Sequence, residues 1–143
     1  MAGVPSIDQF YATLKRLADL PGPSGREHLV REAVIDMLRD SADELYVDTL
    51  GNVVAVKRAG GKGSRKLMLA AHMDEIGLFV YHIDERGFIR VTGIGGVMER
   101  ALLYQRVIVV TRDGRRYRGV IGAKPPHVAK QDESRHVPEL HEL

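Results

Sequence analysis

The hydrophobic pattern of this chain changes near its middle, and that change limits the folds that the chain can adopt. Before residue 72 the apolar residues first recur at helical spacing and then gather in short runs; after Gly77 only short runs separated by turns occur. Such an order predicts an α/β beginning followed by a small all-β barrel or sandwich of hairpins. We place the boundary near residues 74–78, which divides the chain into residues 1–76 and 77–143.

Two helices are expected in the first part. Ser6 and Gln9 have the spacing of a capping box, and the apolar residues that follow lie on one helical face. Ser24 and Glu27 repeat this spacing, so we expect Glu27 to be a capping residue of a second helix that runs to about Asp40.

Strand patterns begin at Glu44. Residues 45–48 and 53–57 predict a hairpin around a Leu-Gly-Asn turn. Residues 66–71 are almost wholly apolar, which is typical of a strand buried on both faces of a sheet. This predicted strand ends at His72.

The second part contains four more strand patterns and no competing helix. They lie at residues 78–83, 88–92, 106–111 and 115–121. From Lys124 onward the sequence is polar and proline-containing, so we expect a loop or a frayed tail.

Composition limits the available chemistry. The chain has no cysteine, so a metal would be held by His, Asp, Glu or backbone oxygen. No signal peptide and no apolar run of ~20 residues is found, which favours a cytoplasmic protein without a membrane partner. Basic residues cluster between Arg86 and Lys124, but acidic residues lie among them and the net charge is only +2. A solvated sheet face is therefore favoured over a nucleic-acid surface.

His72 and Asp74 form the pattern that carries chemistry. A carboxylate that accepts one ring N–H of a histidine fixes the ring and its tautomer, which prepares the other nitrogen for a metal. Open α/β sheets also bind ligands beyond the carboxyl ends of their strands. On spacing alone, a capped or solvated histidine is the competing interpretation.

The rest of a metal centre is harder to find in the sequence. A hydrolytic zinc needs three protein ligands and an open water position. Glu75 is expected to point away from His72, and His82 lies inside a predicted strand. The other candidates follow the predicted strands, at His127, His136 and His141. These residues do not make a set.

Six segments, in order along the chain, resemble the tetrahedral (TET-type) di-metal aminopeptidases. That family includes glutamyl and deblocking aminopeptidases and proteins once labelled as endoglucanases. The segments are residues 20–27, 47–53, 70–77, 94–97, 105–107 and 124–127. They are spread over nearly the whole chain, and residues 70–77 are the most specific.

The resemblance implies a fold and a site. Residues 1–76 would be the N-terminal part of a metallopeptidase catalytic domain that holds two zinc or cobalt ions. Residues 77–143 would be an inserted β-rich dimerisation domain, and the dimers would build hollow dodecamers that trim N-terminal residues from peptides. His72 matches a metal ligand, and Asp74 matches the catalytic carboxylate that orients it.

The resemblance also implies what this sequence lacks. In the family, the remaining metal ligands and the general-base glutamate lie beyond the inserted domain. We therefore expect a truncated chain that is catalytically incomplete alone and binds at most one metal ion, weakly. A separate C-terminal half is one expected partner.

Two other hypotheses stay open at this point. In one, residues 78–121 serve self-association and no chemistry follows. In the other, which is the least favoured, the arginine-rich strands bind nucleic acid.

Overall fold

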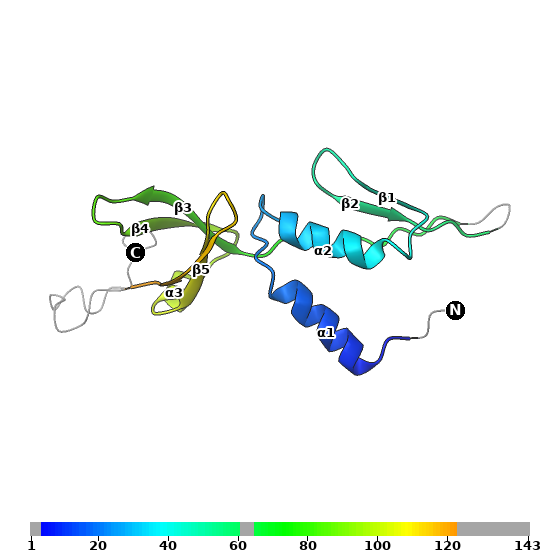
Figure 1. Ribbon diagram of the computed structural model, residues 1–143, viewed down its shortest axis with the longest axis horizontal. Helices are drawn as coiled ribbons and strands as arrows, with labels where there is room; N and C mark the ends of the chain where they lie inside the picture. Colours follow the sequence, from blue (N-terminus) through cyan, green and yellow to red (C-terminus); the bar gives the residue numbers. More distant parts are fainter. Residues whose placement is uncertain (1–3, 61–64, 123–143) are drawn as a thin grey trace. The chain divides into compact units, whose positions relative to one another are not determined.

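Three antiparallel hairpins and three helices make up the described residues of the computed structural model, which are residues 4–60 and 65–122 (Figure 1). In chain order they are α1 (Ile7–Ala18), α2 (His28–Leu38), β1 (Glu44–Val47), β2 (Val53–Val56), β3 (Gly77–Ile83), β4 (Ile89–Ile94), α3 (Glu99–Leu102), β5 (Arg106–Val110) and β6 (Arg116–Val120). The chain divides into two compact units, Met1–Glu75 and Ile76–Leu143. No helix in the described ranges is long and apolar enough to cross a membrane.

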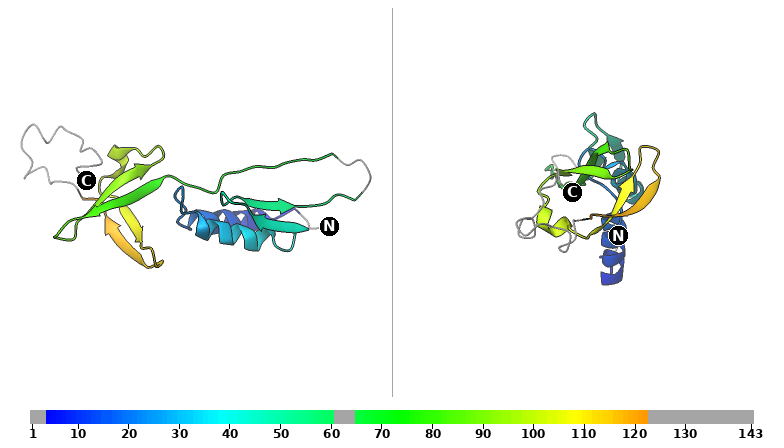
Figure 2. Two further views of the ribbon diagram at one scale, coloured as in Figure 1. Left: turned by 90° about the horizontal axis from the view of Figure 1, so that it is seen from above. Right: turned by 90° about the vertical axis from the view of Figure 1, so that its left-hand side faces the viewer.

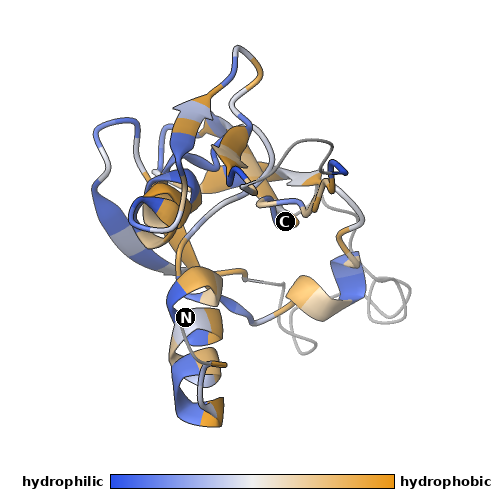
Figure 3. Ribbon diagram, turned by 90° about the vertical axis from the view of Figure 1, so that its right-hand side faces the viewer, coloured by the Kyte–Doolittle hydropathy of each residue, from blue (hydrophilic) through white to orange (hydrophobic). Residues whose placement is uncertain are grey.

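Helix α1 begins as its sequence predicts. The Gln9 amide donates to the Ser6 hydroxyl over 3.3 Å, and the Ser6 amide donates to Gln9 Oε1 over 2.8 Å, so the capping box is confirmed. Apolar and polar residues alternate along the helix (Figure 3). No residue of α1 is buried; Phe10, for example, is 56% exposed.

The start of α2 differs from the prediction. Glu27 is the N-cap residue, but no side chain caps this helix, so the predicted capping box of Ser24 and Glu27 is wrong. Glu27 Oε1 instead accepts from the Gly25 amide over 2.6 Å, and the Ser24 hydroxyl donates to Asp74. Because α2 begins after Glu27, Ser24 lies three residues before the N-cap and is not in the capping position. The helix ends at Leu38, two residues before the predicted end.

The core of the first unit lies between α2 and the β1–β2 hairpin. Val30 and Ala33 of α2 are its buried apolar residues, and the helix packs against β2 (Figure 2, left). The predicted hairpin is confirmed, with Val47 opposite Val53 at the turn end.

The segment that precedes His72 is the main departure in this unit. Residues 65–74 form neither helix nor strand, and Leu67 and Leu69 are 85% and 88% exposed. The predicted buried strand at residues 66–71 is therefore wrong for the described chain. A buried strand needs neighbours on which to form its hydrogen-bond ladder, and no strand among the described residues pairs with this segment.

The second unit contains the predicted hairpins. β3 pairs with β4 and β5 pairs with β6, each in antiparallel register. The prediction of no helix is wrong, because α3 forms one short turn between the hairpins. The two hairpins are separate sheets, so among the described strands no ladder closes a barrel. Among the described residues of this unit, Ile121 is the buried apolar residue, and the predicted tail from Lys124 lies outside the described residues.

Candidate functional site

The predicted pair His72 and Asp74 is in direct contact. His72 Nδ1 lies 2.9 Å from Asp74 Oδ1 and 2.9 Å from the Asp74 backbone oxygen. Both oxygens only accept hydrogen bonds, so Nδ1 carries a proton, and in the neutral ring Nε2 keeps its lone pair. The His72 side chain is 85% exposed, which makes that lone pair accessible. The pair follows an irregular segment of the chain rather than the end of the predicted strand.

A third side chain completes this arrangement. The Ser24 hydroxyl donates to Asp74 Oδ2 over 2.5 Å, so each carboxylate oxygen has its own donor. The Ser24 hydroxyl, and after it the His72 ring N–H, lower the pKa of the Asp74 carboxyl group from its ordinary value. Asp74 is therefore held as a carboxylate that faces the histidine ring.

The turn at residues 21–25 is fastened to the segment that carries the pair. The Gly22 amide donates to Glu75 Oε1 over 3.0 Å, and the Glu75 amide donates to the Gly22 oxygen over 2.9 Å. Pro23 and Glu75 form an isolated parallel bridge. The Glu75 carboxylate is thus used to hold the turn.

Packing sets the position of the same turn. Gly22 is buried, and a Cβ built on it would lie 2.6 Å from a methyl carbon of Val30. Val30 is itself a core residue of α2. The turn therefore rests directly on the core of the first unit, and glycine is required at the point of contact.

The other predicted candidates do not complete a metal centre among the described residues. No group of three or more His, Asp, Glu or Cys side chains that could hold a metal occurs in the described part of the chain. His82 is an exposed residue of β3 in the second unit. The remaining candidates, His127, His136 and His141, lie outside the described residues. The described side chains thus fit one imidazole position of a metal centre rather than a whole centre.

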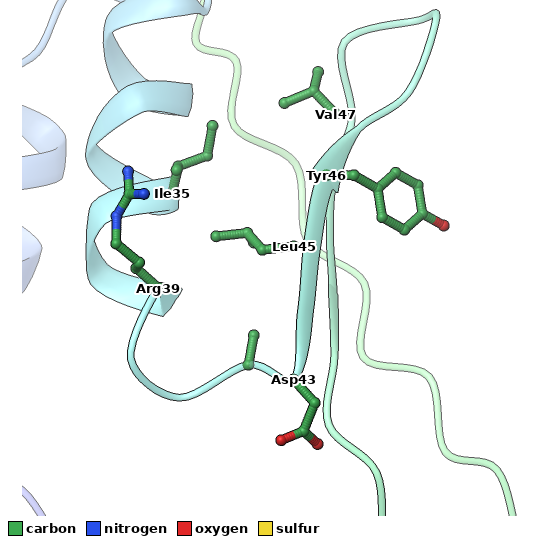
Figure 4. A pocket seen from close by; sticks show the side chains of 7 residues that line it. Ile35, Arg39, Asp43, Leu45, Tyr46 and Val47 are labelled. Atoms are coloured by element: carbon green, nitrogen blue, oxygen red, sulfur yellow. The ribbon is translucent and has the colours of Figure 1, made fainter.

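A pocket lies between α2 and β1 in the described part of the first unit (Figure 4). It is lined by Ile35, Arg39, Ala42, Asp43, Leu45, Tyr46 and Val47. Its carboxylate is already engaged, because Asp43 Oδ1 accepts from Lys57 Nζ over 2.9 Å and Oδ2 accepts from the Arg58 amide over 2.5 Å. The pocket contains no histidine and offers no competing metal position.

Ser24 is the site residue that the sequence analysis missed. Its spacing to Glu27 predicts a helix cap instead. The signal that could have found it is its place in residues 20–27, one of the six family-like segments. Residues 70–77, which contain Asp74, are another of these family-like segments.

Comparison with known proteins gives a consistent result. Residues 51–143 match the sequence profile of the M42 glutamyl aminopeptidase family. Lysyl aminopeptidase of Pyrococcus furiosus is 48% identical over 120 residues, which are 82% of this chain and 33% of that protein.

Solved structures agree with the sequence relatives. Aminopeptidase APDkam598 from the archaeon Desulfurococcus kamchatkensis is 56% identical, with a TM-score of 0.85, over 94% of this chain and 36% of that one. The TET1 peptidase of Pyrococcus horikoshii, which can assemble into a tetrahedron or a large octahedral shell, is 36% identical, with a TM-score of 0.77, over 92% and 38%. The chain thus spans about a third of the length of these relatives.

Proposed function

The chain belongs to the M42 glutamyl aminopeptidase family, and we propose that it supplies the His72–Asp74 part of a di-metal site that removes N-terminal residues from peptides. The observation that carries this proposal is the bond from His72 Nδ1 to Asp74, which leaves Nε2 for a metal. The family profile is named for glutamyl substrates and the Pyrococcus furiosus relative for lysyl substrates. We therefore propose an aminopeptidase without choosing the N-terminal residue. Its cysteine-free composition suits the cytoplasm.

Each residue of the pair has a distinct role. His72 is a metal ligand, and Asp74 holds its ring in one tautomer and one orientation. When bound, two divalent ions, zinc or cobalt, would polarise the scissile carbonyl group and lower the pKa of a water molecule. Because a single imidazole forms no chelate, residues 1–143 alone should bind at most one ion, weakly, and should not turn over peptides.

A chimaera tests this proposal. Residues 1–143 would replace the corresponding third of the Pyrococcus furiosus lysyl aminopeptidase, and hydrolysis of lysyl and glutamyl p-nitroanilides would be measured with added zinc or cobalt. We expect metal-dependent activity that His72→Ala lowers by more than about 100-fold, since even residues that only orient metal ligands contribute 10- to 100-fold.

The matched control for the chimaera is His82→Ala, which removes an exposed histidine from β3 and should leave the activity unchanged. A chimaera that keeps full activity after His72→Ala would overturn the assigned ligand. Turnover by residues 1–143 alone that disappears in His72→Ala would instead show that this part of the chain is sufficient.

A second proposed role is self-association through the unit Ile76–Leu143, as a dimerisation domain. The observation that favours it is the exposure of large apolar side chains along β3: Phe79, Tyr81 and Ile83 are 51%, 54% and 59% exposed. Large exposed apolar side chains are a feature of surfaces that a partner covers. Light scattering of residues 1–143 should give a molar mass of more than one protomer, and Phe79→Lys should lower that mass. A strictly monomeric wild-type chain would contradict this role.

A further inference from the structure

We propose that Ser24 is a positioning residue of this site: its hydroxyl fixes the Asp74 carboxylate, which in turn fixes the ring of His72. The two steps are the 2.5 Å bond from Ser24 to Asp74 Oδ2 and the 2.9 Å bond from His72 to Asp74 Oδ1. The inference rests on the proposed role of His72 as a metal ligand. It adds a residue from a distant turn to the machinery of the site.

The geometry of the carboxylate explains why a second donor matters. The terminal torsion of an aspartate is broad, so a carboxylate with one partner can rotate about its Cβ–Cγ bond. In this site each Asp74 oxygen has a different donor, and rotation would break both hydrogen bonds. Ser24 therefore restricts the torsion that aims Asp74 Oδ1 at the histidine ring.

Ser24 is well placed for this function because its own turn is anchored. Gly22 exchanges two hydrogen bonds with Glu75, one with its carboxylate and one with its backbone amide, and packs against the buried Val30. The position of the hydroxyl is thus set by the core of the first unit. Sites held to their working geometry require this kind of support behind the first layer of residues.

The segment before His72 gives no comparable support. Residues 65–71 form no regular structure, and Leu67, Met68 and Leu69 are at least 85% exposed. The bonds to the 21–25 turn are therefore the described contacts that restrain the site segment. The alternative role for Ser24, as a cap of the neighbouring helix α2, is not supported, because no side chain caps that helix.

Nuclear magnetic resonance of the histidine rings tests the proposal without enzymatic activity. Long-range ¹⁵N–¹H spectra of residues 1–143 at about pH 8, above the ordinary pKa of imidazole, report which nitrogen of each ring carries the proton. His72→Gln assigns the His72 signals. We expect the Nδ1–H form in the wild type and an Nδ1–H to Nε2–H ratio about threefold lower in Ser24→Ala, the effect of losing one modest hydrogen bond.

Three controls separate positioning from general damage. Ser24→Thr keeps a hydroxyl and should restore the wild-type ratio. Ser6→Ala removes a hydroxyl that caps α1 and should leave the His72 tautomer unchanged. The amide signals of β1 and β2 report whether each variant is folded; if Ser24→Ala is not, Ser24→Gly replaces it.

Titration with zinc alone on the same samples gives a second readout. We expect zinc to perturb the Nε2 signal of His72, with an affinity about threefold weaker in Ser24→Ala than in Ser24→Thr. If neither the tautomer ratio nor the zinc affinity changes in Ser24→Ala, the positioning role is overturned. Because the chimaera tests the His72 ligand separately, that result would leave the proposed function standing.

Discussion

The two units differ in how far apart in sequence their hydrogen-bonded partners lie. In the second unit the ladders join neighbouring strands, as where Ile83 pairs with Ile89 across a short turn. In the first unit the site depends on bonds between residues 50 and 53 positions apart, from Ser24 to Asp74 and from Gly22 to Glu75. Closing a longer loop costs more chain entropy before its contacts form. The first unit carries the candidate site, and the structure of that site is the part of the molecule that local sequence specifies least.

The largest expected difference between the units is in amide hydrogen exchange. The amides of residues 67–71 lack a ladder, whereas those of β3 and β4 are paired. We expect the paired amides to exchange at least about 100-fold more slowly, since local opening ranges from almost no cost to the full free energy of unfolding. Faster exchange in β3 and β4 than in residues 67–71 would reverse the comparison.

The same contrast explains which structural features could be predicted. The β3–β4 hairpin was predicted because its turn is specified locally: the Asp84 carboxylate accepts from two nearby amides, and Gly87 adopts a φ of 87°. The apolar residues 66–71 predicted a buried strand that the described chain does not form, because an apolar pattern cannot name the strand that would pair with it. α3 was missed because its four residues are too few for helical periodicity.

The site was predictable to a similar extent. His72 and Asp74 are two residues apart, so their contact follows from spacing together with the family-like segment. Ser24 lies far away in sequence, and its spacing to Glu27 favoured a local helix cap. Only the folded turn shows that the hydroxyl is satisfied by a carboxylate instead.

A substitution at Gly22 tests whether the first unit depends on its anchored turn. A Cβ there would lie 2.6 Å from a Val30 methyl carbon, so the turn or the helix must move. We expect Gly22→Ala to lower the free energy of unfolding of the first unit by about 1–3 kcal/mol, the usual cost of overpacking. Urea unfolding followed through the amide signals of α2 measures this change.

The matched control lies in the other unit. A Cβ on Gly96 would meet nothing within 4 Å, and Gly96 does not have a positive φ. Gly96→Ala should therefore change stability by less than about 0.5 kcal/mol. If Gly22→Ala weakens the β3–β4 amides as much as those of α2, the two units do not unfold separately and the comparison fails.

The smallest expected effect concerns the aspartates that close one hairpin in each unit. The Phe88 amide, and after it the Arg86 amide, lower the pKa of Asp84; the side chain and backbone amides of Asn52 lower the pKa of Asp48. Each carboxyl group has a lower pKa in the folded chain than in the unfolded chain. Each carboxylate therefore stabilises its hairpin fully at pH values above its pKa in the unfolded chain. That contribution is lost as the pH falls through the folded pKa.

At Asp84 an asparagine substitution isolates the charge effect, because both turn amides donate to Oδ1 and the amide oxygen of asparagine can still accept them. At Asp48 the substitution also removes the bond from Asn52 Nδ2 to Oδ2. We expect Asp84→Asn to remove the acid-induced shifts of the β3–β4 amides and to leave those of β1–β2 unchanged, with the reverse for Asp48→Asn. Carboxyl resonances recorded against pH give the two midpoints. A midpoint at or above the ordinary aspartate pKa for either residue would show that its turn amides do not hold the charge. If both midpoints are lowered and each substitution affects only its own hairpin, turn chemistry is local in both units. The difference between the units then lies in the long-range bonds of the 21–25 turn.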